Sequence, residues 1–375
     1  MKFRSRPSSS SRRRGVALLI TVVTIMAITL IVSQLQLNTA VEYKQIRDYI
    51  RVRQLKRALD AAPGLAMRML EEPIAGTAQD TLQDEWAADK YFDIPLDDKR
   101  MVRLTVHIED CSRFYSLKPL LQEDPALLEE GIQRFIEFAQ ACGLDGGIAD
   151  RLARAVAEEA AVRRTEDAVF LELTEEEQEA EQEAQQNAGN PQQGQQTQQN
   201  QELVPLWLDS FTNVPGLSDE DRYAIERAYI ERDDPLDPAG PKVIVRFIDQ
   251  VTLWRSNLPN INTAGREVLL HDVETLRDRP DTVDEILVLR DEEPFMNVSQ
   301  LGNVESLTRE EARQLQAEVR LNSTRFRITA TAAEHRLDDS GSVADSGPIR
   351  TVRSTIIVER RQGGALYTLW RRNEL

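Results

Sequence analysis

The stretch "RRRGVALLITVVTIMAITLIV", residues 12–32, decides the fold. Three arginines lead straight to Gly15, and the seventeen residues from Val16 to Val32 carry no charge and include four Val, four Ile and three Leu. As a helix, segment 16–37 is about 33 Å long at about 1.5 Å per residue, which is enough to cross the hydrocarbon core of a bilayer. A helix buried in a soluble core is the alternative, but the flanking cations and the apolar surface on all sides favour a membrane span.

The charges beside this span predict its orientation. The first fifteen residues hold six basic side chains and no acidic one, and no cation follows Val32 until Lys44. Since the more cationic flank of a span stays in the cytoplasm, we expect a single-pass protein with a cytoplasmic N-terminus and an exported body.

The same region predicts how the chain is processed. A cleaved secretory signal has small residues two places apart after the apolar run, but Ala40 is preceded at that distance by Asn38. A twin-arginine signal fits poorly, because an apolar residue should follow the arginines sooner. A cut between Gly15 and Val16 would instead remove the cations and keep the anchor.

Beyond the span, the helical pattern continues over residues 38–72. Apolar residues recur every four or five positions among polar ones, which predicts an amphipathic helix growing out of the membrane span: Val41, Ile46, Ile50, Leu55 and Leu59. We expect Pro63-Gly64 to bend or end this helix.

The start "RRRGVALLI" followed by one long helix resembles the N-terminus of type IV pilin-like proteins, in which a prepilin peptidase cuts after the glycine and methylates the new N-terminus. Most such subunits carry glutamate at the fifth mature position, where this chain has Ile20. Within the pilin-like proteins, that absence is typical of minor pseudopilin K of type II secretion, the general secretion pathway protein K family. The resemblance implies a cytoplasmic leader 1–15, a transmembrane helix 16–37 in the cell inner membrane and a periplasmic body.

Five segments predict an antiparallel sheet. Segment 100–110 alternates apolar and polar residues, as a half-buried strand does, and turn-rich residues separate the last three segments. The predicted strands are 91–96, 100–110, 325–332, 350–360 and 365–372. Because a long helical pattern lies between the first two and the rest, we expect an α+β fold with the first part of the sheet in 73–110, an inserted helical domain in 111–322 and C-terminal strands in 323–375.

Within the predicted insert, residues 174–202 contain no Val, Ile, Leu, Met or aromatic residue and are rich in Glu and then Gln. Such a segment cannot bury enough apolar area to offset the entropy of ordering, so we predict a disordered linker between two helical pieces.

The run from Asn260 to Leu315 predicts helices with Asn262 or Thr263 as an N-cap, a break at Pro294-Phe295 and a further helix from Ser306. With a half-copy at 211–230, it resembles helix-hairpin-helix units, which often bind DNA. An exported helix-hairpin-helix DNA-binding protein is therefore the alternative function. Residues 258–320 hold fourteen acidic and seven basic residues, which favours a packing role instead.

Two stretches extend the resemblance to pseudopilin K over nearly the whole chain: the "NINTA" run and "IEDCSRFYSLKPL", residues 108–120. Tyr115-Ser116 and Lys118 stand where family members usually have asparagines. The resemblance implies as partners the minor pseudopilins of the I and J types, the major pseudopilin, the prepilin peptidase and the inner-membrane secretion platform. With Ile20 and a bulky insert, the chain is expected at the tip of the pseudopilus, where it starts assembly.

Composition limits the other functions. Removing the six leading cations from a chain of net charge −17 leaves −23, which repels nucleic acids and anionic membranes. Acidic loops allow calcium sites without indicating their ligands. Cys111 and Cys142 allow either one bridge outside the cytoplasm or two separate buried thiols.

No catalytic motif stands out. The three histidines, His107, His271 and His335, lie in none of the familiar metal or nucleophile motifs, and Glu109-Asp110 is an acidic pair with no partner at a suggestive spacing. We therefore expect a protein that is not an enzyme; a membrane-tethered enzyme of another type is a weaker alternative.

Overall fold

The computed structural model describes residues 10–71, 79–171, 214–237, 239–255, 258–338, 342–343, 347–360 and 365–374. The predicted linker 174–202 lies outside these ranges.

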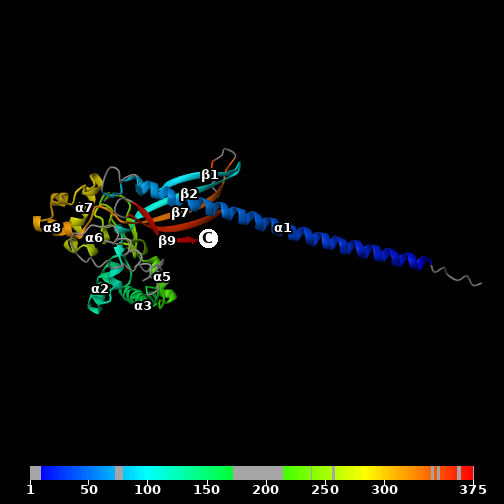
Figure 1. Cartoon of the computed structure of the whole chain (residues 1–375), viewed down its shortest axis with the longest axis horizontal. Coiled ribbons are helices and arrows are strands. Elements are labelled where there is room, and N and C mark those ends of the chain that lie inside the picture. Colours follow the sequence, from blue (N-terminus) through cyan, green and yellow to red (C-terminus); the bar gives the residue numbers. More distant parts are fainter. Residues whose placement is uncertain are drawn as a thin grey trace, which may run out of the picture.

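One long helix organises the molecule. Helix α1 covers Ser10–Glu71, 62 residues, and projects from the body as a rod whose C-terminal part lies along the sheet (Figure 1). Pro63 lies inside this helix, so the prediction that it could end the helix is wrong. An internal proline costs about 3 kcal/mol. That cost is offset because the neighbouring Ala62, Ala66 and Leu70 are fully buried.

The predicted antiparallel sheet is confirmed. Its five strands lie in the order β1-β2-β7-β8-β9, each antiparallel to its neighbour. They are β1 (Lys90–Asp97), β2 (Arg100–Asp110), β7 (Arg325–Arg336), β8 (Arg350–Arg360) and β9 (Leu366–Glu374). The strands predicted at 100–110 and 350–360 have these limits in the structure. In 100–110, apolar and polar residues alternate, which is a strong strand signal, and turn-rich residues border 350–360.

The α1-facing side of the sheet holds one core. Val102, Leu104, Val106 and Ile108 of β2 are buried, as their period of two predicts, against a row of α1 side chains that includes Leu55 and Leu59. Burying each such large side chain contributes about 1.5–3 kcal/mol. The C-terminal part of α1 is therefore a structural element of the body as well as an extension of the anchor.

The insert between β2 and β7 has its own core and gathers at the end of the sheet that is far from the free end of α1 (Figure 1). Its helices are α2 (Pro125–Ala141), α3 (Gly146–Leu171), α5 (Asp219–Arg227), α6 (Arg266–Asp272), α7 (Pro280–Glu292) and α8 (Arg309–Glu318). Aromatic rings fill its centre, with Tyr115 stacked on Phe138 at 4.1 Å between ring centroids.

The insert is not purely helical, which corrects the sequence prediction. Strand β3 (Tyr115–Ser116) pairs in parallel with β6 (Val251–Thr252), and β4 (Tyr229–Arg232) pairs antiparallel with β5 (Val243–Arg246). The predicted half-copy at 211–230 therefore runs from helix α5 into a strand, as expected where aromatic and β-branched residues meet a partner strand.

Short 3₁₀ turns complete the connections. They cover Glu85–Ala87, Cys111–Arg113, Lys118–Leu121, Phe247–Gln250, Glu274–Leu276 and Val298–Asn303.

Candidate functional site: the anchor helix and the junction with the insert

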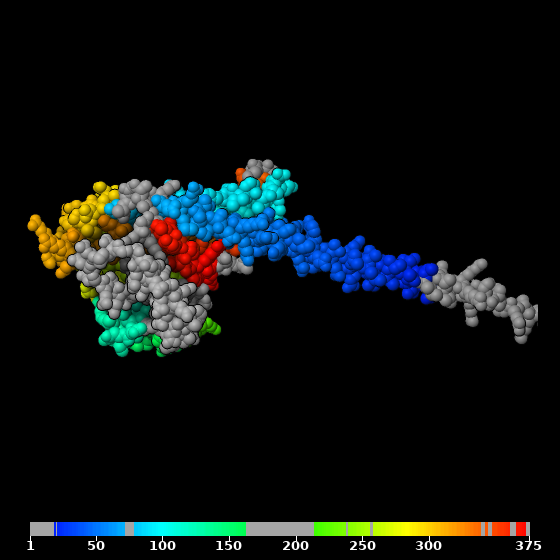
Figure 2. Space-filling view, viewed as in Figure 1, coloured from blue at the N-terminus to red at the C-terminus, as the bar shows by residue number. Residues whose placement is uncertain are grey.

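The N-terminal part of α1 is an uncovered apolar surface. The described side chains from Leu19 to Ile46 are all exposed, and α1 is the one helix there that is long and apolar enough to cross a membrane. Figure 2 shows this part of the helix standing clear of the body. Gly15, Val16 and Ile20 lie on the same helix, where the structure describes their backbone and not their side chains.

The predicted amphipathic row along α1 divides into two parts. Val41, Ile46 and Ile50 are more than half exposed, whereas Leu55 and Leu59 are buried against the sheet. Ile46 and Ile50 lie on the side of the helix opposite Leu59, and Val41 lies on the same side as Leu59 but precedes the part of α1 that packs on the sheet. Leu55 and Leu59 are consequently not available to a partner.

A buried polar cluster joins the sheet to the insert. Asp110, at the end of β2, accepts hydrogen bonds from the hydroxyls of Thr263 and Ser323, each at 2.5 Å, and from the backbone N–H of Ser112 at 2.7 Å. Burial raises the pKa of this carboxyl above its usual value, against the lowering effect of these donors. Asp110 thus connects the end of β2 with Thr263 of the insert and with Ser323, which lies just before β7.

Asp80 holds the second half of this junction. Its carboxylate accepts from Arg360 Nη1 at 2.8 and 2.9 Å and from the backbone N–H of Ser323 at 2.7 Å. Burial raises the pKa of Asp80, and the charge of Arg360 opposes that rise. Arg360 also donates to the carbonyl of Leu70 at 3.1 Å, so a single guanidinium contacts the end of α1 and the segment before β1.

The asparagines of the "NINTA" run bind backbone groups far along the chain. Asn260 Nδ2 donates to the carbonyl of Asp80 and to Ser323 Oγ, both at 3.0 Å, and Asn262 exchanges two hydrogen bonds with the backbone of Phe295, each at 2.9 Å. The predicted N-cap at Asn262 or Thr263 is therefore wrong: α6 begins at Arg266 after Gly265, with no side-chain cap. Asn262 and Thr263 instead form hydrogen bonds with residues far along the chain, Phe295 and Asp110.

The backbone N–H groups that would bind phosphate in a helix-hairpin-helix unit are already hydrogen-bonded within the chain. The backbone N–H groups of Glu305 and Ser306 donate to the carboxylate of Glu285 at 2.5 and 3.2 Å. In a DNA-binding hairpin, amides at such a turn point at phosphate. Here a carboxylate of the same chain occupies them, which favours the packing role.

The unusual positions Tyr115-Ser116 and Lys118 also lie in the insert's core region. Tyr115 and Ser116 are buried in the short strand β3. Lys118 is half-buried, and burial, with the charges of Arg325 and Arg255, lowers its pKa to about 7.

Glu109 has partners that the sequence analysis did not find. On the sheet face away from α1, its carboxylate lies 3.5 Å from His107 Nε2 and 2.9 Å from Arg327 Nη2, and His107 Nδ1 lies 2.6 Å from Asp89. Burial tends to raise the pKa of Glu109, but the hydrogen bond with His107 and the charge of Arg327 lower it to about 2. The hydrogen bond with Glu109 raises the pKa of His107.

These pKa shifts predict how stability depends on pH. In the unfolded chain Glu109 is protonated near its ordinary pKa of 4.5, whereas in the folded chain its pKa is about 2. The unfolded state therefore binds more protons in this window, and the free energy of unfolding should fall by about 2–3 kcal/mol as the pH falls through it. The raised pKa of His107 adds stability at low pH that is lost as the pH rises above 6.5.

Urea unfolding at a series of pH values measures both slopes. Glu109→Gln should have a smaller slope below pH 4.5 than the wild type, while Glu292→Gln, at an exposed site on α7, should keep the wild-type slope. Equal slopes in the wild type and Glu109→Gln would contradict the role of this cluster.

The two cysteines are separate buried thiols, the second of the two arrangements that the sequence allowed. Cys111 packs with Trp254 and Ile357, and Cys142 lies in the core of the insert. His271 lies in α6 with its ring centroid 6.1 Å from that of Phe138, and His335 lies near the end of β7.

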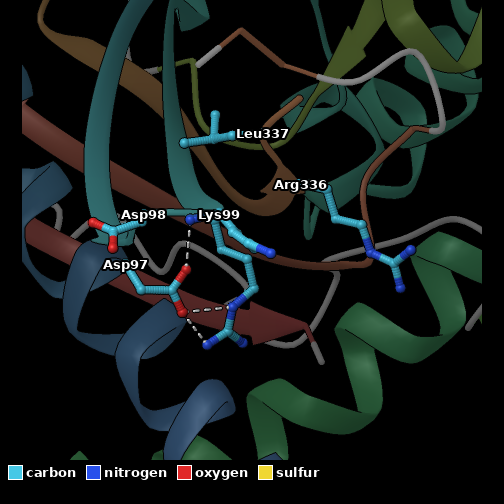
Figure 3. Close-up of a pocket in the computed structure, with 6 residues that line it drawn as sticks. Asp97, Asp98, Lys99, Arg336 and Leu337 are labelled. Atoms are coloured by element: carbon cyan, nitrogen blue, oxygen red, sulfur yellow. Dashed lines mark hydrogen bonds and ion pairs between the residues drawn. The ribbon is translucent and has the colours of Figure 1, made fainter. Parts of the chain in front are cut away.

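A surface hollow lies at the β1–β2 turn, and two of its charged residues, Asp97 and Arg100, form an ion pair with each other. Asp97 accepts from the backbone N–H of Lys99 at 3.0 Å and from Arg100 Nε at 2.8 Å, while Arg336 extends away from this pair (Figure 3). The lining residues are Asp97, Asp98, Lys99, Arg100, Arg336 and Leu337. Across the described residues, no cluster of three or more His, Cys, Asp or Glu side chains could hold a metal ion, so calcium gains no support there.

Comparisons with known proteins find a similarity of fold and no similarity of sequence family. No known protein family matches the chain, and no curated protein sequence matches it. The fold is similar to a chain of the GspK-GspI-GspJ complex from the type 2 secretion system of enterotoxigenic Escherichia coli, with a TM-score of 0.48 and 13% sequence identity over 88% of this chain and 99% of that chain.

Proposed function

We propose that this protein is a non-catalytic minor pseudopilin of a type II protein secretion system, of the K type, which starts assembly of the periplasmic pseudopilus and stays at its tip. The observation that carries the proposal is helix α1. It is unbroken from Ser10 to Glu71, its first part is apolar and uncovered, and its last part is packed under a five-stranded antiparallel sheet. That arrangement joins an inner-membrane anchor to an exported body through one rigid element.

The tip position follows from two features. An α-amino group within lipid costs several kcal/mol unless a neighbour pairs with it, and in pilin-like proteins the fifth-position glutamate is thought to meet that group in the next subunit. Ile20 at this position has no charge to pair with the α-amino group of a subunit ahead of it, so this chain needs no subunit ahead of it. The insert, at the end of the sheet far from the free end of α1, would also obstruct a subunit placed beyond it.

The test is assembly in the native host. The full-length chain should occur once per complex with two further minor pseudopilins, and cross-links should place it at one end of the fibre. Quantitative mass spectrometry of the cross-linked complex measures both. Repeated copies along the shaft, or filaments of this chain alone, would contradict the tip assignment.

Maturation gives a separate prediction. The mature N-terminus should be Val16, because a cut after Gly15 discards the cations and keeps the anchor. Gly15→Leu should leave the uncut chain in the membrane, since a branched side chain should not fit a peptidase that accepts glycine. N-terminal sequencing of the membrane-bound protein checks this, with Pro7→Ala as a control within the leader. A start at Met1 or near Val41 in the wild type would rule out the proposed cut.

A further inference from the structure

Helix α1 has a second row of side chains, and this row is exposed to solvent. Its members recur at spacings of three or four, and each of them is exposed. We call this row the outer ridge: Tyr43, Ile46, Ile50, Arg53, Arg57, Ala61, Gly64 and Arg68. Spacings of three and four place side chains in one stripe along a helix.

The outer ridge faces away from the sheet. Arg53, Arg57, Gly64 and Arg68 each precede by two residues a buried position, namely Leu55, Leu59, Ala66 and Leu70. Two residues correspond to about 200° around an α-helix, so the ridge lies opposite the row that packs on the sheet. The same helix thus has one face that is buried and one that has the spacing of a helix-packing face without a partner.

The chemistry of the outer ridge changes along its length. Near the membrane span it is apolar, with Tyr43, Ile46 and Ile50 exposed by 67%, 59% and 51%. Farther out it carries Arg53, Arg57 and Arg68, and no described residue forms a hydrogen bond or ion pair with any of these three guanidinium groups. This contrasts with the adjacent Asp60, which is bound by Arg371 at 2.6 Å.

Small residues lie between the arginines. Ala61 and Gly64 separate Arg57 from Arg68, and a Cβ built on Gly64 would meet nothing within 4 Å. A neighbouring helix can therefore approach closely at this level, while its side chains reach the guanidinium groups on either side.

We propose that the outer ridge docks a helix of a different polypeptide whose facing row is apolar next to the membrane and acidic opposite Arg53, Arg57 and Arg68. The proposal rests on the proposed function, since it names the chemistry of a partner subunit. Charge complementarity selects the partner: carboxylates would pair with the three arginines, which are the residues suited to bidentate contacts. A second copy of this chain, parallel and in register, would place arginine against arginine and is disfavoured.

Photocross-linking in native membranes tests the inference. A cross-linking amino acid is placed on the ridge at Ala61 and, as a control, at the exposed Lys56, which lies about 100° around the helix from Arg57. The Ala61 position should label a membrane-anchored helix with Asp or Glu at the cross-linked level, at least about tenfold above the Lys56 position. Equal labelling at both positions, self-labelling, or a partner row without acids would overturn the proposal.

Charge reversal supplies the second arm. Arg53→Glu/Arg57→Glu/Arg68→Glu should lower cross-linking from Ile46 at least about tenfold, because like charges then face each other. Arginines in place of the partner's cross-linked acids should restore it. Arg246→Glu/Arg309→Glu/Arg313→Glu makes the same charge change at exposed sites of the insert and should leave the yield unchanged. An unchanged yield in the ridge variant would overturn the proposal.

The outcomes separate this inference from the proposed function. If the labelled acidic helix belongs to a protein without a basic-glycine-apolar start, the ridge inference holds and the pseudopilin proposal fails. If the chain assembles at a pseudopilus tip while Ile46 and Ala61 label no helix, the ridge inference fails alone.

Discussion

Asp80→Ala should lower the free energy of unfolding by about 3–5 kcal/mol, because it leaves the guanidinium of Arg360 half-buried without its carboxylate. Asp80 is 1% exposed and also accepts from the backbone of Ser323. The substitution therefore removes the charge partner of β8 and an anchor of the segment that leads from the insert into β7.

Urea unfolding of the full-length protein in detergent, followed by tryptophan fluorescence, measures this effect. Asp93→Ala is the matched control, because Asp93 pairs with Arg103 in solvent, where an ion pair contributes about 0–1 kcal/mol. The double variant Asp80→Ala/Arg360→Met should lose less than Asp80→Ala, since no buried charge is then left unpaired. A loss below about 1 kcal/mol for Asp80→Ala would show that the junction is not stabilising.

Gly143→Ala should cost about 2–4 kcal/mol, for two reasons that add. Gly143 has φ +86°, a backbone conformation that an alanine adopts at a cost of roughly 1 kcal/mol. An added Cβ would also lie 2.4 Å from the carbonyl oxygen of Tyr229, so β4 or the end of α2 must move, as in an overpacked core.

Gly216→Ala separates these two contributions. Gly216 has φ +85°, but a Cβ added there would meet nothing within 4 Å. This variant should therefore show the backbone cost of about 1 kcal/mol alone in the same urea experiment. If the free energy of unfolding falls equally in both glycine variants, the close approach to Tyr229 does not contribute to the cost of Gly143→Ala.

The elements that could be predicted are those with a repeating local signal. Alternation over 100–110 located β2, the turn-rich residues on either side of 350–360 located β8, and apolar composition located the anchor. Pro63 does not end the helix as its residue type suggests. Its local free-energy cost is outweighed because the helical turns around it pack against a sheet formed by residues far along the chain.

The junction could not be predicted from local patterns. Asn262 and Thr263 have the residue types of an N-cap, but their partners are Phe295 and Asp110, and Asp80 carries no sequence signal that it meets Arg360. By contrast, one pairing was available and missed: His107 and Glu109 are two residues apart on a strand and so must share a face. Their further partners Asp89 and Arg327 depend on sheet register.

The position of the insert has a consequence for how the protein unfolds. Asp110 and Phe326 are partners in the β2–β7 ladder, so the chain leaves the sheet and returns to it at neighbouring points. The core of the insert and the core under α1 share no residue. The insert can therefore unfold as one cooperative unit while the β2–β7 ladder holds its two ends together. On heating, the insert can unfold first, as a loop closed by the ladder, and α1 with the five-stranded sheet can unfold in a second transition.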